Sequence, residues 1–192
     1  VFESGGLVRS QAARDYVSHV QKLAMLDSGR LDWREWIEVA TEIARWDLEV
    51  EKLGDPGLEQ AHEGQKKELN AAFGRFVEQE YPNWVHSEPD NRPILSHDLV
   101  ERYAAQRIRE GERVVIIVLE CMRMHHWLTI APLLEPFFRV ETDYYYSLLP
   151  TATPYSRNAI FGGLLIDDLG KKNSDLWSEK SDDERRELVD RR

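Results

Sequence analysis

The chain has 192 residues, and its 25 Lys and Arg against 35 Asp and Glu give a formal net charge of −10. With 42% apolar and 31% charged residues, the composition is typical of a folded globular protein and excludes a collagen-like or disordered chain. The acidic balance argues against a duplex-DNA binder, and no apolar run approaches the ~20 residues of a membrane span. The single cysteine, Cys121, excludes an intrachain disulfide and fits a reducing, cytoplasmic setting.

The N-terminal part of the sequence predicts amphipathic helices. Apolar residues recur at three- and four-residue spacing over residues 10–26, where Ser28-Gly29 ends the run. A second helix follows, with Asp32 as its predicted N-cap and Glu35 at the capping-box position. The breaker cluster at residues 54–57 ends that helix.

A third helix is predicted over about residues 58–80, and Tyr81-Pro82 is expected to stop it. Three amphipathic helices joined by short links predict a three-helix bundle over residues 1–82. The Trp residues of the second helix are expected in its core. Four scattered histidines are expected on the surface: His19, His62, His86 and His97.

Residues 83–112 hold three prolines and read as a linker with one short helix, residues 97–110, capped by Ser96. The periodicity then changes. A continuous β-branched run predicts a buried strand over residues 113–120, and a second strand is predicted over residues 138–148.

A helical stretch over residues 124–134 lies between the two predicted strands, which makes a βαβ unit with a parallel sheet. The predicted fold class is therefore mixed, a three-helix bundle followed by a partial α/β domain over residues 113–192. The charged tail, residues 171–192, is expected to form a solvated helix.

Two segments lie where an α/β sheet places its ligands, outside the carboxyl ends of the strands. Glu120 ends the first predicted strand, and Thr153 follows the second as the predicted N-cap of a helix that begins with Pro154 and stops at Gly162-Gly163. A hydroxyl at a helix N-terminus suits a phosphate or an attack on one, and a nearby carboxylate could hold an activating metal. A plain N-cap is the alternative for Thr153, and a solvated carboxylate is the alternative for Glu120.

The segment Leu149-Pro150-Thr151-Ala152-Thr153-Pro154-Tyr155-Ser156-Arg157-Asn158-Ala159-Ile160-Phe161 resembles the nucleophile segment of PglZ domains in the alkaline phosphatase superfamily. The similarity is greatest to the PglZ effector domain of PorX-type response regulators. Matches over most of the chain support it: Asp15–Ser18, Pro56–Leu58 with Gln65–Glu68, Asn91–Ser96, Val114–Trp127 and Asp143–Ser147.

The resemblance implies a cytoplasmic two-zinc phosphodiesterase or phosphatase that acts on a phosphoester or nucleotide-like substrate as the output of two-component signalling. It implies Thr153 as the nucleophile, with Thr151 as the second choice, and Glu120 and Thr153 as metal ligands. Arg123, Arg157 and Asn158 would contact the phosphate. In the family layout the bundle lies between a receiver domain and the PglZ domain.

On this layout the chain holds the bundle and the first part of the PglZ domain, without the receiver and without the later Asp and His ligands. The 192 residues alone are therefore expected to be inactive. The sequence departs from the family pattern in two places, with Glu120 in place of an aspartate and His125-His126 in place of Asp-Gln. These departures leave a second hypothesis open, a catalytically inactive regulatory or dimerisation module, with a homodimer as one form.

Overall fold

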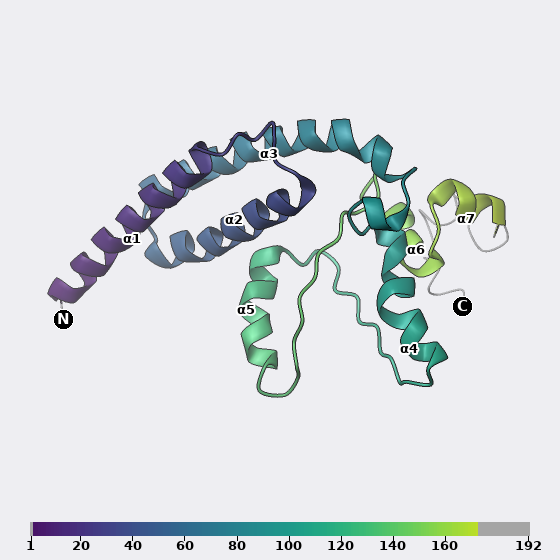
Figure 1. The fold of residues 1–192 in the computed structure, drawn as a ribbon. Coiled ribbons are helices and arrows are strands. Elements are labelled where there is room, and N and C mark those ends of the chain that lie inside the picture. The colour runs from purple at the N-terminus through teal and green to yellow at the C-terminus, as the bar shows by residue number, and fades with distance from the viewer. Residues whose placement is uncertain (1, 173–192) are drawn as a thin grey trace. The chain divides into compact units, whose positions relative to one another are not determined.

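The computed structural model describes residues 2–172, with side chains from residue 11 onward (Figure 1). The predicted charged tail lies outside the described residues after position 172. The chain divides into two compact units, each described here by itself. Over the described part of the chain, the first unit combines residues 2–85 with 119–142, and the second combines residues 86–118 with 143–172. Within the described residues, no helix is both long and apolar enough to cross a membrane.

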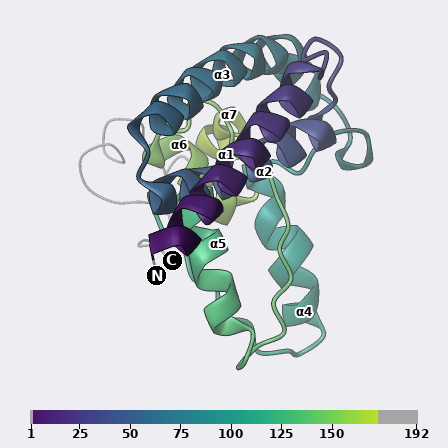
Figure 2. The ribbon, with the colours of Figure 1, turned by 90° about the vertical axis from the view of Figure 1, so that its left-hand side faces the viewer.

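The first unit is built from four helices. They are α1 (Phe2–Ala24), α2 (Trp33–Leu53), α3 (Pro56–Trp84) and α5 (Met124–Leu134). Helix α2 packs against each of the other three (Figures 1 and 2). The predicted helical N-terminal part is confirmed, and α5 has the predicted bounds of residues 124–134.

Helix α2 starts with the predicted capping box. The Asp32 carboxylate accepts the backbone N–H groups of Arg34 and Glu35 at 2.7 and 2.9 Å. In return, the Glu35 carboxylate accepts the Asp32 N–H at 2.7 Å. At the other end Gly54 has a φ of 58°, in the left-handed region where glycine meets no Cβ strain. The two ends of α2 are thus set by local sequence.

Helix α3 is longer at both ends than predicted. Asp55 caps its start by accepting the N–H groups of Gly57 and Leu58, so Pro56 is the first helical residue. The prediction that Tyr81-Pro82 stops the helix was wrong, because α3 continues to Trp84. A proline in the last turn removes one N–H donor, which a helix tolerates when it ends within a few residues.

The core of the first unit gathers apolar and aromatic side chains of α1, α2 and α3. Trp36 is its centre, with ring contacts to Phe73 and Phe76 at centroid separations of 5.3 and 5.9 Å. Leu23, Val39 and Ala72 are buried beside it. Burial of such side chains contributes roughly 1.5–3 kcal/mol each, which makes this cluster the main stabilising feature of the helical domain.

A second, polar cluster lies in the first unit, and it corrects the expectation of surface histidines. His19 and His62 are only 6% and 3% exposed. Both rings contact Tyr16, and His19 also packs on Trp46. His19 lies 3.4 Å from the Glu42 carboxylate. Periodicity did not reveal these positions, because a histidine on a helix face is compatible with either environment.

This burial predicts that acid will destabilise the chain through His19. Burial lowers the pKa of His19, against the opposing charge of Glu42 and with smaller contributions from His62 and Lys22. Because the folded state favours the neutral ring, the stabilisation is full above about pH 6.5 and is lost as the pH falls below it. Urea unfolding at pH 7.5 and 5.5 should show a smaller pH effect in His19→Gln than in the wild type. The exposed His86→Gln should behave as the wild type, and an equal pH effect in all three proteins would refute the assignment.

The second unit has short helical elements. They are a 3₁₀ turn, η1 (Pro89–Asn91), another, η2 (Ser96–Asp98), a π turn, η3 (Glu101–Ala105), and the helices α4 (Gln106–Arg109), α6 (Thr153–Gly162) and α7 (Ile166–Lys172). The predicted helix 97–110 therefore exists as three successive helical types. Helix α6 packs against η2 and α7. Leu95, Ala159 and Leu169 are fully buried and form the centre of this unit.

The predicted strands are not confirmed. Residues 113–120 form no strand, and Val115 and Ile117 are 83% and 77% exposed. A β-branched run becomes a strand only when neighbouring backbone pairs with it, and the part of the chain that the structure describes offers this run no such pairing. Over residues 138–148 the pairing is a single parallel bridge between Leu95 and Tyr146. The α/β part of the fold class stays a prediction.

Candidate functional site

The segment proposed to carry the nucleophile forms the start of α6. Thr153 is its first residue, and the N-cap is Ala152 rather than Thr153, one position earlier than predicted. The difference follows from Pro154, which fits either of the first two helical positions because neither needs an N–H donor there. The Thr153 and Thr151 side chains are both exposed. The hydroxyl of Thr153 is therefore accessible at a helix N-terminus.

The first turns of α6 favour an anion. No acidic residue lies in its first turn, and Arg157 is half-buried one turn further on. The N-terminal end of a helix carries a partial positive charge, equivalent to roughly +0.5 of an elementary charge. Ser156 steadies this end because its hydroxyl donates to the carbonyls of Thr151 and Ala152.

Asn158 lies in the interior of the second unit, whereas Thr153 is exposed. It is fully buried, and its Nδ2 donates to the Pro154 carbonyl at 2.8 Å within the same helix. This bond holds a carbonyl in the first turn of α6. In the structure Asn158 supports the helix, and a phosphate contact by its side chain stays a prediction.

The segment that leads to α6 pairs in parallel with the segment around Leu95, through a bridge between Leu95 and Tyr146. The Tyr146 N–H donates to the Ile94 carbonyl at 2.8 Å, and the Leu148 N–H donates to the Ser96 hydroxyl at 3.0 Å. Ser96 and Leu148 are 0% and 3% exposed. Ser96 was predicted to cap a helix, but its hydroxyl instead ties the residue that precedes Leu149-Pro150 to η2. The two bonds fix the chain five residues before Thr153.

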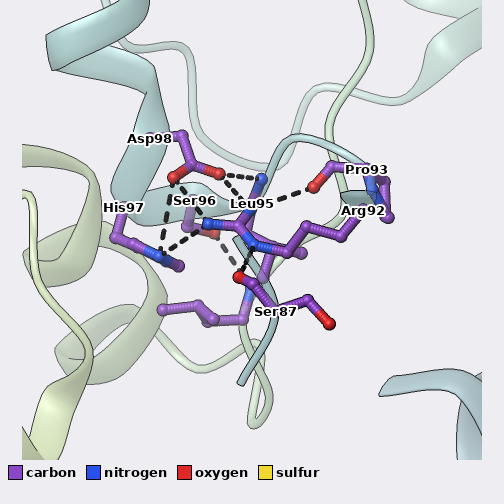
Figure 3. Close-up of polar contacts among 8 residues, drawn as sticks. Ser87, Arg92, Pro93, Leu95, Ser96, His97 and Asp98 are labelled. Carbon is purple, nitrogen blue, oxygen red and sulfur yellow. Dashed lines mark hydrogen bonds and ion pairs between the residues drawn. The ribbon is translucent and has the colours of Figure 1, made fainter. Parts of the chain in front are cut away.

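Arg92 and Asp98 pair with each other close to Ser96, and these three residues make up a polar frame that holds the segment before α6 (Figure 3). Arg92 donates to both carboxylate oxygens of Asp98, at 2.5 and 3.0 Å, and its Nε donates to the Ser87 carbonyl at 3.1 Å. Its Nη1 also donates to the Pro93 carbonyl. Asp98 in turn accepts the Leu95 N–H at 2.7 Å. One buried guanidinium thus joins the segment before η2 to η2 itself.

The charge states in this frame follow from its contacts. Burial alone would raise the pKa of Asp98, but the hydrogen bonds from Arg92 and the Leu95 backbone outweigh it and lower that pKa. Burial lowers the pKa of His97, against the opposing effect of Asp98. At neutral pH the frame therefore holds an ionised Asp98–Arg92 pair beside a neutral His97.

Asp143 has a partner in the preceding helical region. The Tyr103 hydroxyl donates to one oxygen of Asp143, and the other oxygen accepts the Tyr144 N–H at 2.8 Å. The hydrogen bond from Tyr103 lowers the pKa of Asp143. Asp143 begins the segment that leads to Tyr146 and Leu148, so its contact with Tyr103 helps to position that segment.

The remaining predicted site residues belong to the first unit. Glu120 and Arg123 are exposed, and Arg123 is the N-cap of α5. The Arg123 N–H donates to Nδ1 of His126 at 3.2 Å, and His125 lies 3.7 Å from the Asp47 carboxylate. The structure therefore gives each of the two adjacent histidines a contact within its own unit.

An alkaline phosphatase-like site would need a cluster of metal ligands. Across residues 2–172, the structure gathers no three His, Cys, Asp or Glu side chains that could hold a metal ion. Thr153 belongs to one unit and Glu120 to the other, so their predicted pairing is not tested. The described side chains therefore do not by themselves make up a two-metal centre.

Sequence reasoning did not find the Arg92–Asp98 frame as a unit. The signal available was the segment Asn91–Ser96, which was noted only for its resemblance to the family. The sequence alone did not show that Arg92 and Asp98 pair in the interior, because an arginine and an aspartate six positions apart usually lie in solvent. Burial of the Arg92 side chain to 4% exposure distinguishes this one.

Comparison with protein families gives two matches. The PorX response regulator linker domain matches residues 6–85, and the BREX system PglZ alkaline phosphatase-like domain matches residues 99–191. A comparison with curated proteins found no match. The two family matches follow one another along the chain and agree with the resemblance of the helical part and of the α6 segment. Together the two matches are those expected of a PglZ protein of the PorX response-regulator type, which confirms the resemblance seen in the sequence.

Proposed function

We propose that this chain carries the output domain of a response regulator, which hydrolyses phosphoesters, with a nucleotide-like phosphodiester as the substrate class. The observation that carries the proposal is the exposed Thr153 at the first position of α6, in a segment that resembles the PglZ nucleophile segment and lies within the PglZ domain match. The buried frame of Arg92, Asp98 and Ser96 supports it, because this frame holds the chain that leads to Thr153.

In the proposed reaction, the Thr153 oxygen attacks phosphorus in line with the leaving alcohol. A bond forms between Thr153 Oγ and phosphorus while the hydroxyl gives up its proton to solvent, the bond to the leaving oxygen breaks, and the departing alkoxide takes a proton from solvent, so that no net proton is gained or lost. Water then cleaves the phosphothreonine and restores the hydroxyl. Arg157 and the N-terminal end of α6 would stabilise the negative charge on the phosphoryl oxygens.

The alkaline phosphatase-like family suggests metal dependence in general terms, and zinc is the metal proposed here. Zinc would act as a Lewis acid toward the phosphoryl group. Of this chain's residues, Glu120 and Thr153 are the proposed ligands. Glutamate has one methylene more than the family's aspartate, and this moves its oxygens by roughly an ångström, enough to change the site.

Zinc titration tests the assignment of Glu120. Isothermal calorimetry on the chain, with any further domains that its reading frame encodes, should show stoichiometric binding that weakens at least about tenfold in Glu120→Ala. The exposed Glu112→Ala, which removes a carboxylate paired with Arg107, should bind as the wild type. Equal affinity in all three proteins would exclude Glu120 as a ligand. A phosphodiester assay on the 192 residues alone separately tests the expectation that they are inactive.

The alternative function, an inactive regulatory module, has one specific observation in its favour. His125 occupies a position that departs from the family pattern, and it lies beside Asp47 of α2. A contact of this kind with a residue of the linker match is compatible with a regulatory role for His125. Absence of zinc binding in the wild type, together with absence of phosphodiester turnover, would favour this function.

A further inference from the structure

The Asp47 carboxylate collects nitrogen groups from two other helices. Its Oδ1 accepts hydrogen bonds from His62 Nε2 at 3.0 Å and from Lys66 Nζ at 2.9 Å, both on α3. Its Oδ2 lies 3.7 Å from Nδ1 of His125 on α5. The Asp47 carboxylate is therefore in reach of both α3 and α5.

This cluster is partly shielded from water. The His62 side chain is 3% exposed, and those of Asp47 and His125 are each 23% exposed. Burial alone would lower the pKa of Lys66, but its hydrogen bonds to Glu63 and Asp47 outweigh burial and raise it. A cation is therefore retained beside Asp47, and pairs shielded in this way interact more strongly than pairs in open solvent.

The contact joins segments that match two different families. Asp47, His62 and Lys66 lie within the match to the response-regulator linker domain, whereas His125 lies within the match to the PglZ domain. Helix α5 nevertheless packs against α2 and belongs to the same compact unit as α1, α2 and α3. The half-buried side chains of α5 recur at helical spacing on one face, at Met124, Leu128, Ala131 and Leu134.

The segment that precedes α5 contains predicted site residues. Glu120 and Arg123 immediately precede α5, and the Arg123 N–H is bound to His126 in the first turn of α5. At the other side, Trp127 Nε1 donates to Thr142 at 3.1 Å. A shift of α5 on α2 would therefore be transmitted to both flanking segments.

From these contacts we propose that α2 of the linker domain, whose Asp47 is bound by α3, forms an intramolecular docking surface for α5 of the PglZ domain, with Asp47 at its polar centre. Through this surface the state of the linker helices sets the position of the Glu120–Arg123 segment. The proposal rests on the described contacts and not on the hydrolase assignment, so failure of either leaves the other standing.

Hydrogen exchange on the whole chain tests this docking surface. Asp47→Asn, which keeps the shape and removes the charge, and His125→Gln should each lower the protection of the α5 amides by about 3- to 5-fold, as expected for a partly exposed pair. The double variant should lose no more than the larger single loss, because both substitutions remove the same contact. Glu49→Gln on the same helix, whose carboxylate pairs with Lys52, should leave α5 unchanged.

A second readout separates docking from damage to the linker itself. His125→Gln should leave α3 protection within about twofold of the wild type, since Lys66 and His62 still bind Asp47 in that variant. Unchanged α5 protection in both single variants would overturn the proposal. A loss in Asp47→Asn that is as large in the His125→Gln background would also overturn it, because Asp47 would then act through α3 alone.

Discussion

Replacement of Asp98 by alanine should lower the free energy of unfolding by about 3 kcal/mol, the largest stability loss expected from one side chain in the second unit. The reason is the Arg92 guanidinium, whose side chain is 4% exposed and would keep its charge without a carboxylate partner. The Leu95 N–H would also lose its acceptor. Urea denaturation followed by tryptophan fluorescence and circular dichroism measures the change.

Two variants make this result specific. Asp98→Asn keeps an acceptor for the Leu95 N–H and should lose less than Asp98→Ala. Glu101→Ala removes a carboxylate from the adjoining helical turn, where its pair with Arg109 is exposed and screened by solvent, and should leave stability close to that of the wild type. An Asp98→Ala variant that is as stable as Glu101→Ala would show that the buried pair contributes nothing to the frame.

The largest expected effect on activity belongs to Thr153. In a protein that turns over a phosphodiester, Thr153→Ala should lower kcat by at least about 10³-fold, because alanine leaves no hydroxyl at the first position of α6 to attack phosphorus. Since the side chain is exposed, the same substitution should alter stability by at most about 0.5 kcal/mol. Chromogenic phosphodiester hydrolysis with added zinc is the measurement.

The neighbouring threonine is the matched control. Thr151 is also exposed, two residues earlier and outside the helix, so Thr151→Ala should keep most of the activity. Thr153→Ser retains a hydroxyl at the same position and should keep measurable turnover. If Thr151→Ala abolishes hydrolysis while Thr153→Ala preserves it, the nucleophile is Thr151, the second choice from the sequence.

Local signals in the sequence predicted the helices well. The capping box of Asp32 and Glu35, the glycine at position 54 and the start of α5 at Met124 depend on residues within one turn of each other. Such features are encoded in short stretches and need no tertiary contact. The one-residue difference at α6 and the extension of α3 beyond Pro82 lie within the usual variation of helix ends.

Tertiary features were predicted less well, for a physical reason. A strand over residues 113–120 depends on backbone partners elsewhere in the chain, and the exposure of Val115 shows that composition alone does not provide them. Burial of His62 and Arg92 depends likewise on which helix face or turn is covered, which one sequence does not specify. Thr153 and Glu120 were identified from the expected strand ends and helix start. Arg123, Arg157 and Asn158 were identified from the resemblance alone, because a phosphate contact leaves no local pattern in the sequence.

The most direct measurement is to locate the phosphorylated residue. An acid quench of the protein during turnover of a ³²P-labelled phosphodiester, followed by peptide mass spectrometry, should find phosphate on Thr153 in the peptide that spans α6. The label should be absent in Thr153→Ala. Turnover with no phosphorylated threonine, or with the phosphate on another residue, would contradict the assignment of Thr153 as the nucleophile.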